Sequence, residues 1–372
     1  MLRATVALVL ALIHFGVPLI YYFSLRKWLG KDWGLVRDSG YRPLVSVVIP
    51  TYNEARFIVE KLNDVYRQNY PRDKLEIIVV DSASTDGTSE LAKKWISEHS
   101  DVKAILISES VRRGKVYSLN NALRHASGEI IVVTDADSFW ESDDALSKVI
   151  GFFKDPLVGA VSCLKKPRGP GVAGVEEGYR EYYNIVRVAE SKVWSTPIFH
   201  GELAAFRKDL LIKIGGFPTD IGSDDSYVAT EIVFRGHRSI VSDDVWCIET
   251  IPKDDYGEWR IRRAQHLIQS FVKTLKKHRL DSAPKPFRKI FLAEAYLHLV
   301  NPWLLLGSAI SAIASALNRN IIGLMILVTG LLLILYKPYR TWIATQIYLI
   351  AAAIRNLWNK EIIWNKQSKV SN

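Results

Sequence analysis

Long stretches without charged side chains at both ends of the chain constrain its fold more than any other feature. Residues 4–25 contain no Asp, Glu, Lys or Arg, and neither do residues 295–318 or 320–336. A membrane-spanning helix needs about 20 predominantly apolar residues. Charged residues make up 24% of the 372 residues and are concentrated between these stretches. We therefore expect a polar globular part that is held at both ends by apolar helices, rather than a purely soluble protein.

The first apolar segment has the properties of a retained membrane anchor rather than of a cleaved signal peptide. Its core, Thr5–Phe23, is longer than a typical signal-peptide core, and no small-x-small cleavage site follows it. Five Lys and Arg side chains lie in residues 26–42, whereas only Arg3 and the amino terminus precede the segment. Because cytoplasmic flanks carry the excess of Lys and Arg, we expect residues 1–30 to be an anchor in the cell membrane and the polar middle to be cytoplasmic.

The C-terminal region, residues 291–358, is expected to hold two or three membrane spans. Two of its apolar stretches would be joined by a tight external hairpin at Arg319. Thr341–Ile354 is shorter, and the sequence leaves open whether it forms a third span or a helix lying in the interface. The remaining parts are predicted to be amphipathic basic interfacial helices at residues 253–290 and a polar tail at residues 359–372.

The polar middle, residues 43–252, alternates short β-branched runs with helical patterns. The predicted strands are Val45–Ile49, Ile77–Val80, Ala104–Ile107 and Ile130–Thr134. The predicted helices are Arg56–Arg67, Ser89–Glu98, Lys115–His125 and Asp143–Phe153. This alternation is typical of an α/β fold with a doubly wound sheet, in which ligands bind beyond the carboxyl ends of the strands.

Polar residues follow three of the four predicted strands. They are Pro50–Glu54, Asp81–Thr88 and Asp135-Ala136-Asp137. Turn formation and helix capping explain the first two equally well. Two carboxylates two residues apart repel each other unless a cation is near, and carboxylates suit a hard cation such as Mg²⁺ or Mn²⁺. No GxGxxG motif or P-loop is present, so nicotinamide-cofactor and P-loop functions lack their phosphate loops.

Several motifs in order resemble glycosyltransferase family 2 over roughly residues 43–270. The motifs are Pro50–Glu54, the Val79–Thr88 run, Gly114-Lys115 with Leu119–Leu123, Thr134–Asp137, Gly201–Arg207, Ile214–Phe217 and Asp224-Asp225. The resemblance implies a GT-A fold, which is a Rossmann-like nucleotide-sugar-binding domain. It also implies a transferase that uses a nucleotide-diphosphate sugar and inverts the anomeric centre.

The resemblance also implies roles for the residues that bind the donor. The base and ribose pocket would be lined by Pro50, Thr51, Tyr52 and Glu54, with Asp81 accepting hydrogen bonds from the base. Asp135 would contact the ribose or the metal, and Asp137 would be a metal ligand. The metal would be Mg²⁺ or Mn²⁺, because a leaving diphosphate gains negative charge that a Lewis acid stabilises.

Lys115 stands at the start of a predicted helix, where both its charge and the helix end favour phosphate. The alternative is a solvated surface lysine.

The pair Asp224-Asp225 resembles the Glu-Asp motif of the family, whose second residue is the general base. A hydroxyl acceptor needs such a base because its own pKa is high. We therefore predict that Asp225 is catalytic, that Asp224 contacts substrate, and that the adjacent carboxylate raises the pKa of Asp225. The alternative is an acidic pair that caps a helix.

The basic run Trp259–Arg263 lies where processive polysaccharide synthases carry Gln-x-x-Arg-Trp. Arg262 aligns with the arginine of that motif and would clamp the pyrophosphate. Trp259 stands at the Gln position and Arg263 at the Trp position, where the residue would contact substrate. Because the aromatic residue is missing there, the motif does not predict processivity. The alternative is a basic surface attracted to anionic lipid.

These observations predict a membrane-bound, cytosol-facing glycosyltransferase of the hexosyltransferase type with a lipid-linked or glycan hydroxyl acceptor. The alternatives are a processive polysaccharide synthase, a polyprenyl-phosphate sugar transferase, or a membrane scaffold or transporter with a nucleotide-binding domain. The net charge of +10 is explained by the membrane surface, since no aromatic-interleaved basic stripe indicates nucleic acid. His200, beside the expected acceptor pocket, is interpreted as a structural histidine.

Overall fold

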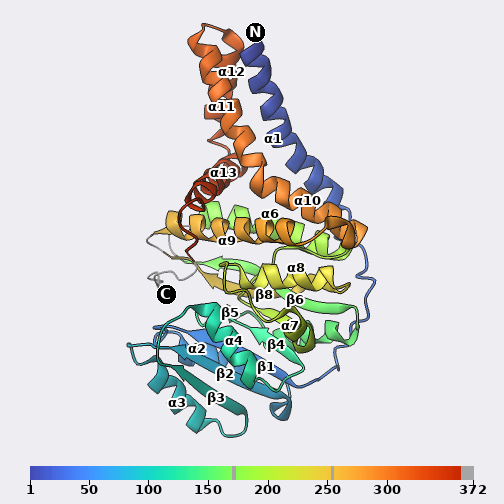
Figure 1. Ribbon diagram of the computed structural model, residues 1–372, viewed down its shortest axis with the longest axis vertical. Coiled ribbons are helices and arrows are strands. Elements are labelled where there is room, and N and C mark those ends of the chain that lie inside the picture. Colours follow the sequence, from blue (N-terminus) through green and yellow to red (C-terminus); the bar gives the residue numbers. More distant parts are fainter. Residues whose placement is uncertain (170–172, 253–254, 362–372) are drawn as a thin grey trace.

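The computed structural model describes residues 1–169, 173–252 and 255–361. Figure 1 shows a body built around one sheet, from which helices project at one end. The strands are β1 (Val45–Thr51), β2 (Leu75–Ser82), β3 (Lys103–Glu109), β4 (Ile130–Val133), β5 (Ser138–Trp140), β6 (Val158–Arg168), β7 (Ala204–Arg207) and β8 (Arg238–Thr250). The helices of the body are α2 (Ile58–Tyr66), α3 (Thr88–Glu98), α4 (Lys115–His125), α5 (Ala145–Gly151), α6 (Ala173–Val193), α7 (Lys208–Ile214), α8 (Asp224–Phe234) and α9 (Tyr256–Lys277).

The apolar ends of the chain also form helices. They are α1 (Leu2–Arg26), α10 (Lys285–Leu299), α11 (Asn301–Leu317), α12 (Ile321–Leu333) and α13 (Lys337–Arg355). Three short 3₁₀ helices, η1 (Arg72–Lys74), η2 (Phe152–Lys154) and η3 (Leu280–Ser282), connect other elements.

The eight strands form one sheet in the order β3-β2-β1-β4-β7-β6-β8-β5. β1 to β4, which correspond to the four predicted strands, are parallel to one another. β7 then runs antiparallel to both β4 and β6. The α/β fold class is therefore confirmed, and the sheet is mixed rather than wholly parallel.

Helices cover both faces of the sheet, and the strands alternate between two apolar cores. Val47 and Ile49 pack with side chains of α2, α3 and α5 on one face. Val48, between them, packs with side chains of α4, α7 and α8 on the other. Neighbouring residues of a strand point to opposite faces of the sheet. A strand that is covered on both faces, such as β1, therefore needs a nearly continuous apolar run, and Val45–Ile49 is such a run.

Two long helices, α6 and α9, lie between the sheet and the projecting helices (Figure 1). α9 lies within the segment expected to form basic interfacial helices. α6 was not predicted, because its charged and aromatic residues gave no clear boundary in the sequence. Its side chains include Arg180 and Arg187, which are buried in ion pairs.

The described chain has two helices that are long and apolar enough to cross a membrane, which are α1 and the helix Lys285–Leu317 made of α10 and α11. α12 and α13 meet the same criteria only together and are bent by 106° at the break between them. At the predicted hairpin Arg319 has a positive φ of 56°, and Asn320 caps α12.

α13 is attached to the body rather than projecting with α11 and α12 (Figure 1). The Arg355 guanidinium lies 2.6 Å from the Glu258 carboxylate of α9, and Gln269 of α9 donates a hydrogen bond to Asn356. Most of the predicted polar tail, residues 362–372, lies outside the described residues.

A fully buried charged cluster joins α1, α6 and α10. The Arg187 guanidinium contacts Glu190 at 2.6 Å and Glu294 at 3.0 Å, and all three side chains are inaccessible to solvent. The Tyr21 hydroxyl donates to Glu190 at 2.5 Å. Because buried charges tolerate little displacement from their partners, this cluster fixes α1 and α10 relative to the body.

Candidate functional site

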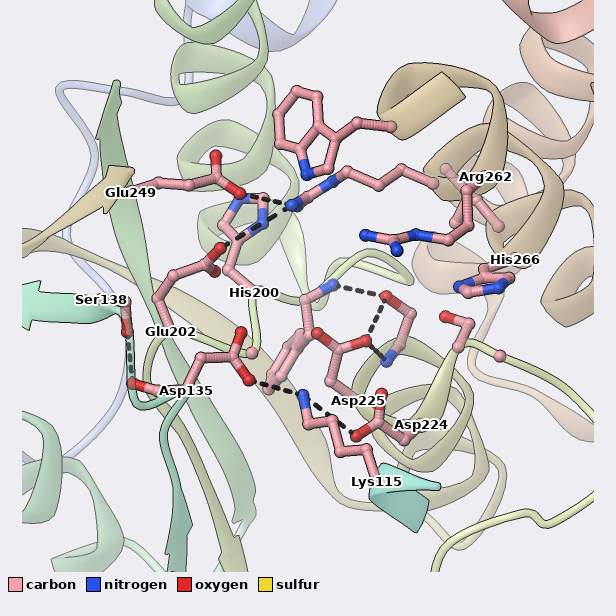
Figure 2. Close-up of a pocket in the computed structure, with 18 of the residues that line it drawn as sticks. Lys115, Asp135, Ser138, His200, Glu202, Asp224, Asp225, Glu249, Arg262 and His266 are labelled. Carbon is pink, nitrogen blue, oxygen red and sulfur yellow. Dashed lines mark hydrogen bonds and ion pairs between the residues drawn. The ribbon is translucent and has the colours of Figure 1, made fainter. Parts of the chain in front are cut away.

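A cavity of about 330 Å³ opens at the carboxyl ends of β1 and β4, beneath α9 (Figure 2). Its walls include the end of β1 with Pro50–Tyr52 and Glu54, the loop Asp135–Ser138, the start of α4 with Lys115, the start of α8 with Ser223–Ser226, and, on α9, Trp259, Arg260, Arg262, Arg263, Ala264 and His266. The sheet edge predicted from the sequence is thus the place where these residues meet.

The loops after β1 and β2 are tied to each other by hydrogen bonds. The Thr85 amide donates to the Asn53 side chain at 2.8 Å, and the Glu54 amide donates to the Thr88 hydroxyl at 2.8 Å. Asn53 has a positive φ of 55°, which asparagine tolerates better than most residues. Asn53 and Thr88 therefore shape the loops, while Pro50, Thr51, Tyr52 and Glu54 line the cavity.

Asp81 is not among the described residues that line the cavity. Both of its carboxylate oxygens already accept hydrogen bonds from the protein, from Thr51 at 3.2 Å, from the Ser84 hydroxyl at 2.5 Å and from Ser89 at 2.7 Å. The structure thus holds Asp81 behind the pocket wall. Contact with a nucleotide base would require at least one of these hydroxyls to turn away.

Lys115 lies between two carboxylates of the cavity. Its Nζ is 2.9 Å from Asp135 and 3.4 Å from Asp224. Burial disfavours the charged form, but the carboxylates of Asp135, Asp224 and Asp225 outweigh it and raise the pKa of Lys115. Lys115 is therefore a fixed positive charge within the cavity rather than the solvated surface lysine of the alternative interpretation.

Asp225 is half-buried at the start of α8, and its carboxylate faces the same centre. Burial, and next the neighbouring Asp224 carboxylate, raise the pKa of Asp225 to about 6, although Lys115 acts in the opposite direction. A carboxylate whose pKa is raised toward neutrality has the basicity that a general base needs. Asp225 Oδ1 also accepts the Ser226 amide hydrogen. The N-cap residue of α8 is Ser223, and it makes no capping hydrogen bond with its side chain, so the acidic pair is not the helix cap of the alternative interpretation.

Gly201 marks the point at which these charged groups converge. A Cβ at this position would lie 3.1 Å from Lys115 Nζ, 3.4 Å from Asp225 Oδ2 and 3.7 Å from Asp135 Oδ2. Only a residue without a side chain leaves this volume free, so a reacting group can be surrounded there by a lysine and two carboxylates.

The loop after β4 offers oxygen ligands suited to a hard cation. Asp135 and Asp137 both line the cavity. Within residues 1–169, 173–252 and 255–361, no group of three or more His, Cys, Asp or Glu side chains is arranged to hold a metal ion. Mg²⁺-type cations are commonly held by one or two carboxylates together with substrate phosphates and water. The donor set therefore fits a cation that arrives with a diphosphate.

Arg262 and Arg263 of α9 are placed differently. Arg262 faces the cavity (Figure 2). Burial and the charge of Arg263 lower the pKa of Arg262 to about 10, while Asp137 and Asp135 act in the opposite direction. Arg263 forms an ion pair with Glu249, and its guanidinium lies 4.8 Å from the centre of the Trp259 ring. The structure thus brings Arg262 toward the acidic loop, whereas Arg263 is engaged by Glu249.

Two residues of the cavity wall, Arg112 and Glu202, were not predicted from the sequence as site residues. His200 was predicted to be a structural histidine. Arg112 stacks on Tyr52, with its guanidinium carbon 3.8 Å from the centre of the ring, and both residues line the cavity. Glu202 is buried beside Gly201, and only its place in a family motif pointed to it. His200 is buried in the wall, where burial and next Lys165 lower its pKa well below the usual value. It is therefore neutral, as expected of a structural histidine.

The sequence matches the family model "Glycosyl transferase family 2" over residues 46–215. It is 26% identical over 246 residues to poly-beta-1,6-N-acetyl-D-glucosamine synthase of Staphylococcus aureus, which covers 63% of this chain and 58% of the relative. The synthase of the same name from Staphylococcus epidermidis is 26% identical over 279 residues, covering 72% of this chain and 66% of the relative. The chain thus spans about 58% of the length of the Staphylococcus aureus synthase.

One solved structure resembles the chain over almost its whole length. It is a mannosyltransferase from Pyrobaculum calidifontis in complex with GDP-Man and Mn²⁺. It is 52% identical, has a TM-score of 0.89, and the match covers 96% of this chain and 100% of the other. The family match and this likeness agree with the ordered motifs, the GT-A-like sheet and the site at its carboxyl edge. The chain therefore belongs to glycosyltransferase family 2.

Proposed function

We propose that this glycosyltransferase transfers a hexose, with inversion, from a nucleotide-diphosphate sugar to a hydroxyl acceptor at the cytosolic face of a membrane. The observation that carries the proposal is the convergence of Lys115, Asp135 and Asp225 around the space above Gly201. GDP-mannose is the donor we propose, because the Pyrobaculum mannosyltransferase that was solved with GDP-Man is 52% identical over nearly the whole chain.

The donor diphosphate would lie among the charged residues at the sheet edge. Asp137 and Asp135 would hold a divalent cation, which neutralises charge on the leaving diphosphate when it is bound. Lys115 and Arg262 add positive charge from α4 and α9 on either side of the loop. Such preorganised charges stabilise a developing anion without the reorganisation that water would need.

Asp225 would take the proton of the acceptor hydroxyl. Its pKa of about 6 leaves it mostly ionised at neutral pH and still basic enough to accept a proton. Since Asp225 and Asp135 approach the same point from different elements, α8 and the loop after β4, the acceptor and the anomeric carbon can meet between them.

The acceptor is proposed to be lipid-linked or a glycan presented at the bilayer. The same cavity is also lined by Leu267 of α9, His298 of α10, and Thr345, Tyr348 and Leu349 of α13. These helices adjoin the apolar ones, so an acceptor held by the membrane would approach from that side. An acceptor that is a neutral hydroxyl accounts for the presence of a base better than a phosphate acceptor, which is already nucleophilic.

The proposed domain organisation follows from the same arrangement. Residues 1–30 and 291–358 would be the membrane parts, residues 43–252 the catalytic domain and residues 253–290 the interfacial helices. A cysteine introduced at Arg319 should react with a membrane-impermeant maleimide added to intact cells, whereas a cysteine in the exposed position Lys94 should react only after permeabilisation. Cys163 and Cys247 are buried and give little background. Labelling at position 94 from outside would contradict the cytosolic placement.

A donor screen tests the proposed function. The purified full-length protein is incubated with GDP-mannose, other GDP-sugars, UDP-sugars and dTDP-sugars, with and without Mn²⁺, in the presence of membrane lipid extract. We expect Mn²⁺-dependent release of GDP from GDP-mannose and transfer of labelled mannose into the lipid or glycan fraction. Transfer of a sugar only from a UDP- or dTDP-donor would reject the proposed donor, and labelled product in the soluble fraction alone would reject the proposed acceptor class.

A further inference from the structure

Glu202 occupies a position that the proposed mechanism does not use. It follows Gly201, the point at which Lys115, Asp135 and Asp225 converge, and it lines the same cavity. The residue is only 3% exposed. Buried carboxylate oxygens normally have hydrogen-bond partners.

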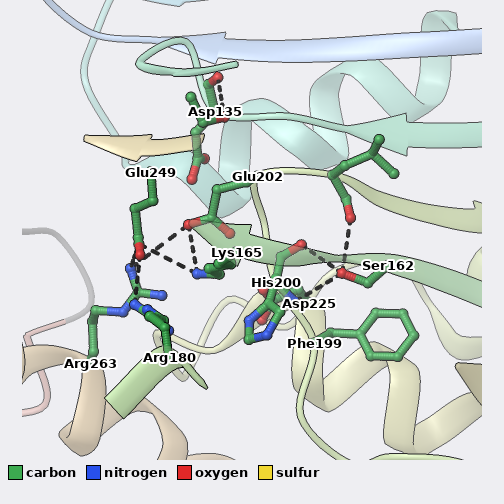
Figure 3. Close-up of polar contacts among 12 residues, drawn as sticks. Asp135, Ser162, Lys165, Arg180, Phe199, His200, Glu202, Asp225, Glu249 and Arg263 are labelled. Atoms are coloured by element: carbon green, nitrogen blue, oxygen red, sulfur yellow. Dashed lines mark hydrogen bonds and ion pairs between the residues drawn. The ribbon is translucent and has the colours of Figure 1, made fainter. Parts of the chain in front are cut away.

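The backbone and one carboxylate oxygen of Glu202 are fixed by hydrogen bonds. Its carbonyl oxygen accepts from the Thr134 hydroxyl at 2.7 Å and from the Trp140 indole at 3.1 Å. Its Oε1 accepts from Lys165 Nζ at 2.6 Å, and the Lys165 side chain is fully buried (Figure 3). The backbone of Glu202 is therefore tied to the segment that carries Asp135, and its side chain is tied to β6 through Lys165.

The other oxygen, Oε2, is buried without a hydrogen-bond partner in the described chain. Burial first, and then the Glu249 carboxylate, raise the pKa of Glu202 to about 7 against the opposing charge of Lys165. Oε2 is therefore an acceptor above this pH, and Glu249 cannot supply it with a proton. Burial opposes the ionisation of Glu249, but Arg180, Arg263 and Lys165 outweigh it and hold its pKa well below the usual value. The Arg180 guanidinium lies 2.6 Å from Glu249 Oε2, so that carboxylate is already matched by cations. An acceptor left unpaired in a buried place is costly, and a bound ligand would satisfy it.

The surroundings of Oε2 select the kind of donor that a ligand must bring. A phosphate would be repelled by the Glu202 carboxylate, and an ammonium group would face the nearby Lys165, Arg180 and Arg263. A neutral hydroxyl has neither problem and has one hydrogen to donate. Hexoses carry such hydroxyls on every side of the ring.

We propose that Glu202 binds the transferred sugar, its Oε2 accepting a hydrogen bond from one hydroxyl of the donor hexose and thereby selecting donors that carry this hydroxyl. The inference rests on the proposed function and adds to it a residue that determines sugar specificity. Sites built to bind a substrate hydroxyl discriminate strongly against analogues that lack it, because the protein group is then left unpaired.

The test pairs each donor with two forms of the protein. GDP-mannose and its four analogues lacking one of the 2-, 3-, 4- or 6-hydroxyls are turned over by the wild type and by Glu202→Gln. In the wild type we expect kcat/KM to fall about 10- to 100-fold for one of the analogues on account of this bond. In Glu202→Gln, the loss of that same hydroxyl should change kcat/KM by less than about 3-fold relative to the variant's own rate with GDP-mannose.

Glu176→Gln is the matched control. Glu176 is a buried carboxylate of the same cluster, paired with Arg180 at 2.7 Å and Arg260 at 3.2 Å, but it does not line the cavity. It should keep the wild-type pattern across the analogues. GDP affinity and the thermal unfolding midpoint of each variant separate loss of a sugar contact from loss of structure.

The outcomes distinguish this inference from the proposed function. If the wild type transfers mannose but tolerates the removal of each hydroxyl within about 2-fold, the role of Glu202 is overturned while the proposed function stands, even if no variant folds. The role is equally overturned if Glu202→Gln is as sensitive to the analogues as the wild type. If the wild type does not use GDP-mannose at all, the proposal that GDP-mannose is the donor is wrong.

Discussion

Asp225→Asn should lower the rate of sugar transfer by about 10²–10⁴-fold while the affinity for the donor stays within a few-fold of the wild type. The substitution keeps the shape of the side chain and one oxygen but removes nearly all of its basicity, and general-base catalysis is typically worth this factor. The rate is measured as transfer to acceptor, and donor affinity by calorimetric titration. A variant that transfers at nearly the wild-type rate would contradict the role of Asp225.

The pH dependence gives an independent readout of the same group. Because the base must be ionised to accept a proton, and because burial and Asp224 raise the pKa of Asp225 to about 6, kcat/KM should fall as the pH is lowered through 6. The fall should approach tenfold per pH unit below this value, and Asp225→Asn should lose this limb. Asp224→Asn should keep this limb but move it to lower pH, because the Asp224 carboxylate helps to raise the pKa of Asp225. If the double variant of Asp224 and Asp225 remains fully active, the acceptor is a phosphate that needs no base.

Asp137→Asn should have the second large effect, on the use of the metal. The substitution removes one of the two carboxylates that the loop after β4 presents, and a divalent cation at a leaving diphosphate contributes several kcal/mol to transition-state stabilisation. We expect kcat/KM for the donor to fall by about 100-fold or more at limiting Mn²⁺, with partial recovery when Mn²⁺ is in excess. Chelation of the metal should abolish the activity of the wild type.

Asp209→Asn is the matched control for this loss of charge. Asp209 is an exposed acidic residue that pairs with Lys213 on α7, away from the cavity. Its variant should keep wild-type activity and wild-type metal dependence. If Asp137→Asn turned over the donor as fast as the wild type when Mn²⁺ is limiting, the assignment of the metal site would be wrong.

The part of the fold that carries the donor site was predictable because its pattern is local. Val45–Ile49 and Ile130–Thr134 are short β-branched runs, and the helix at Lys115–His125 has the boundaries that were expected. Their polar continuations must meet at one edge, since parallel strands end on the same side of a sheet. The meeting of Lys115 with Asp135 followed from this topology, whereas Asp225 was assigned only through its resemblance to a family motif.

The other half of the fold depends on long-range contacts that leave no local signal. β7 is a run of four residues between β4 and β6, and its direction is set by its neighbours rather than by its own sequence. Asp81 was expected to be a pocket residue because it lies at the carboxyl end of β2, yet its carboxylate is engaged by the hydroxyls around it. Glu202 was equally hidden, because its importance comes from Lys165, which lies 37 residues away in the chain.

The buried Arg187–Glu190–Glu294 cluster, with Tyr21, fixes the distance between the catalytic body and the apolar helices. Removing one partner of such a cluster leaves an uncompensated charge and costs about 3–5 kcal/mol, so the body cannot slide along α1 or α10. In the proposed orientation the reaction centre at Gly201 then stands at one constant height above the bilayer. Acceptors would be sorted by length as well as by chemistry: a hydroxyl too close to the lipid, or too far out on a grown chain, would miss the base.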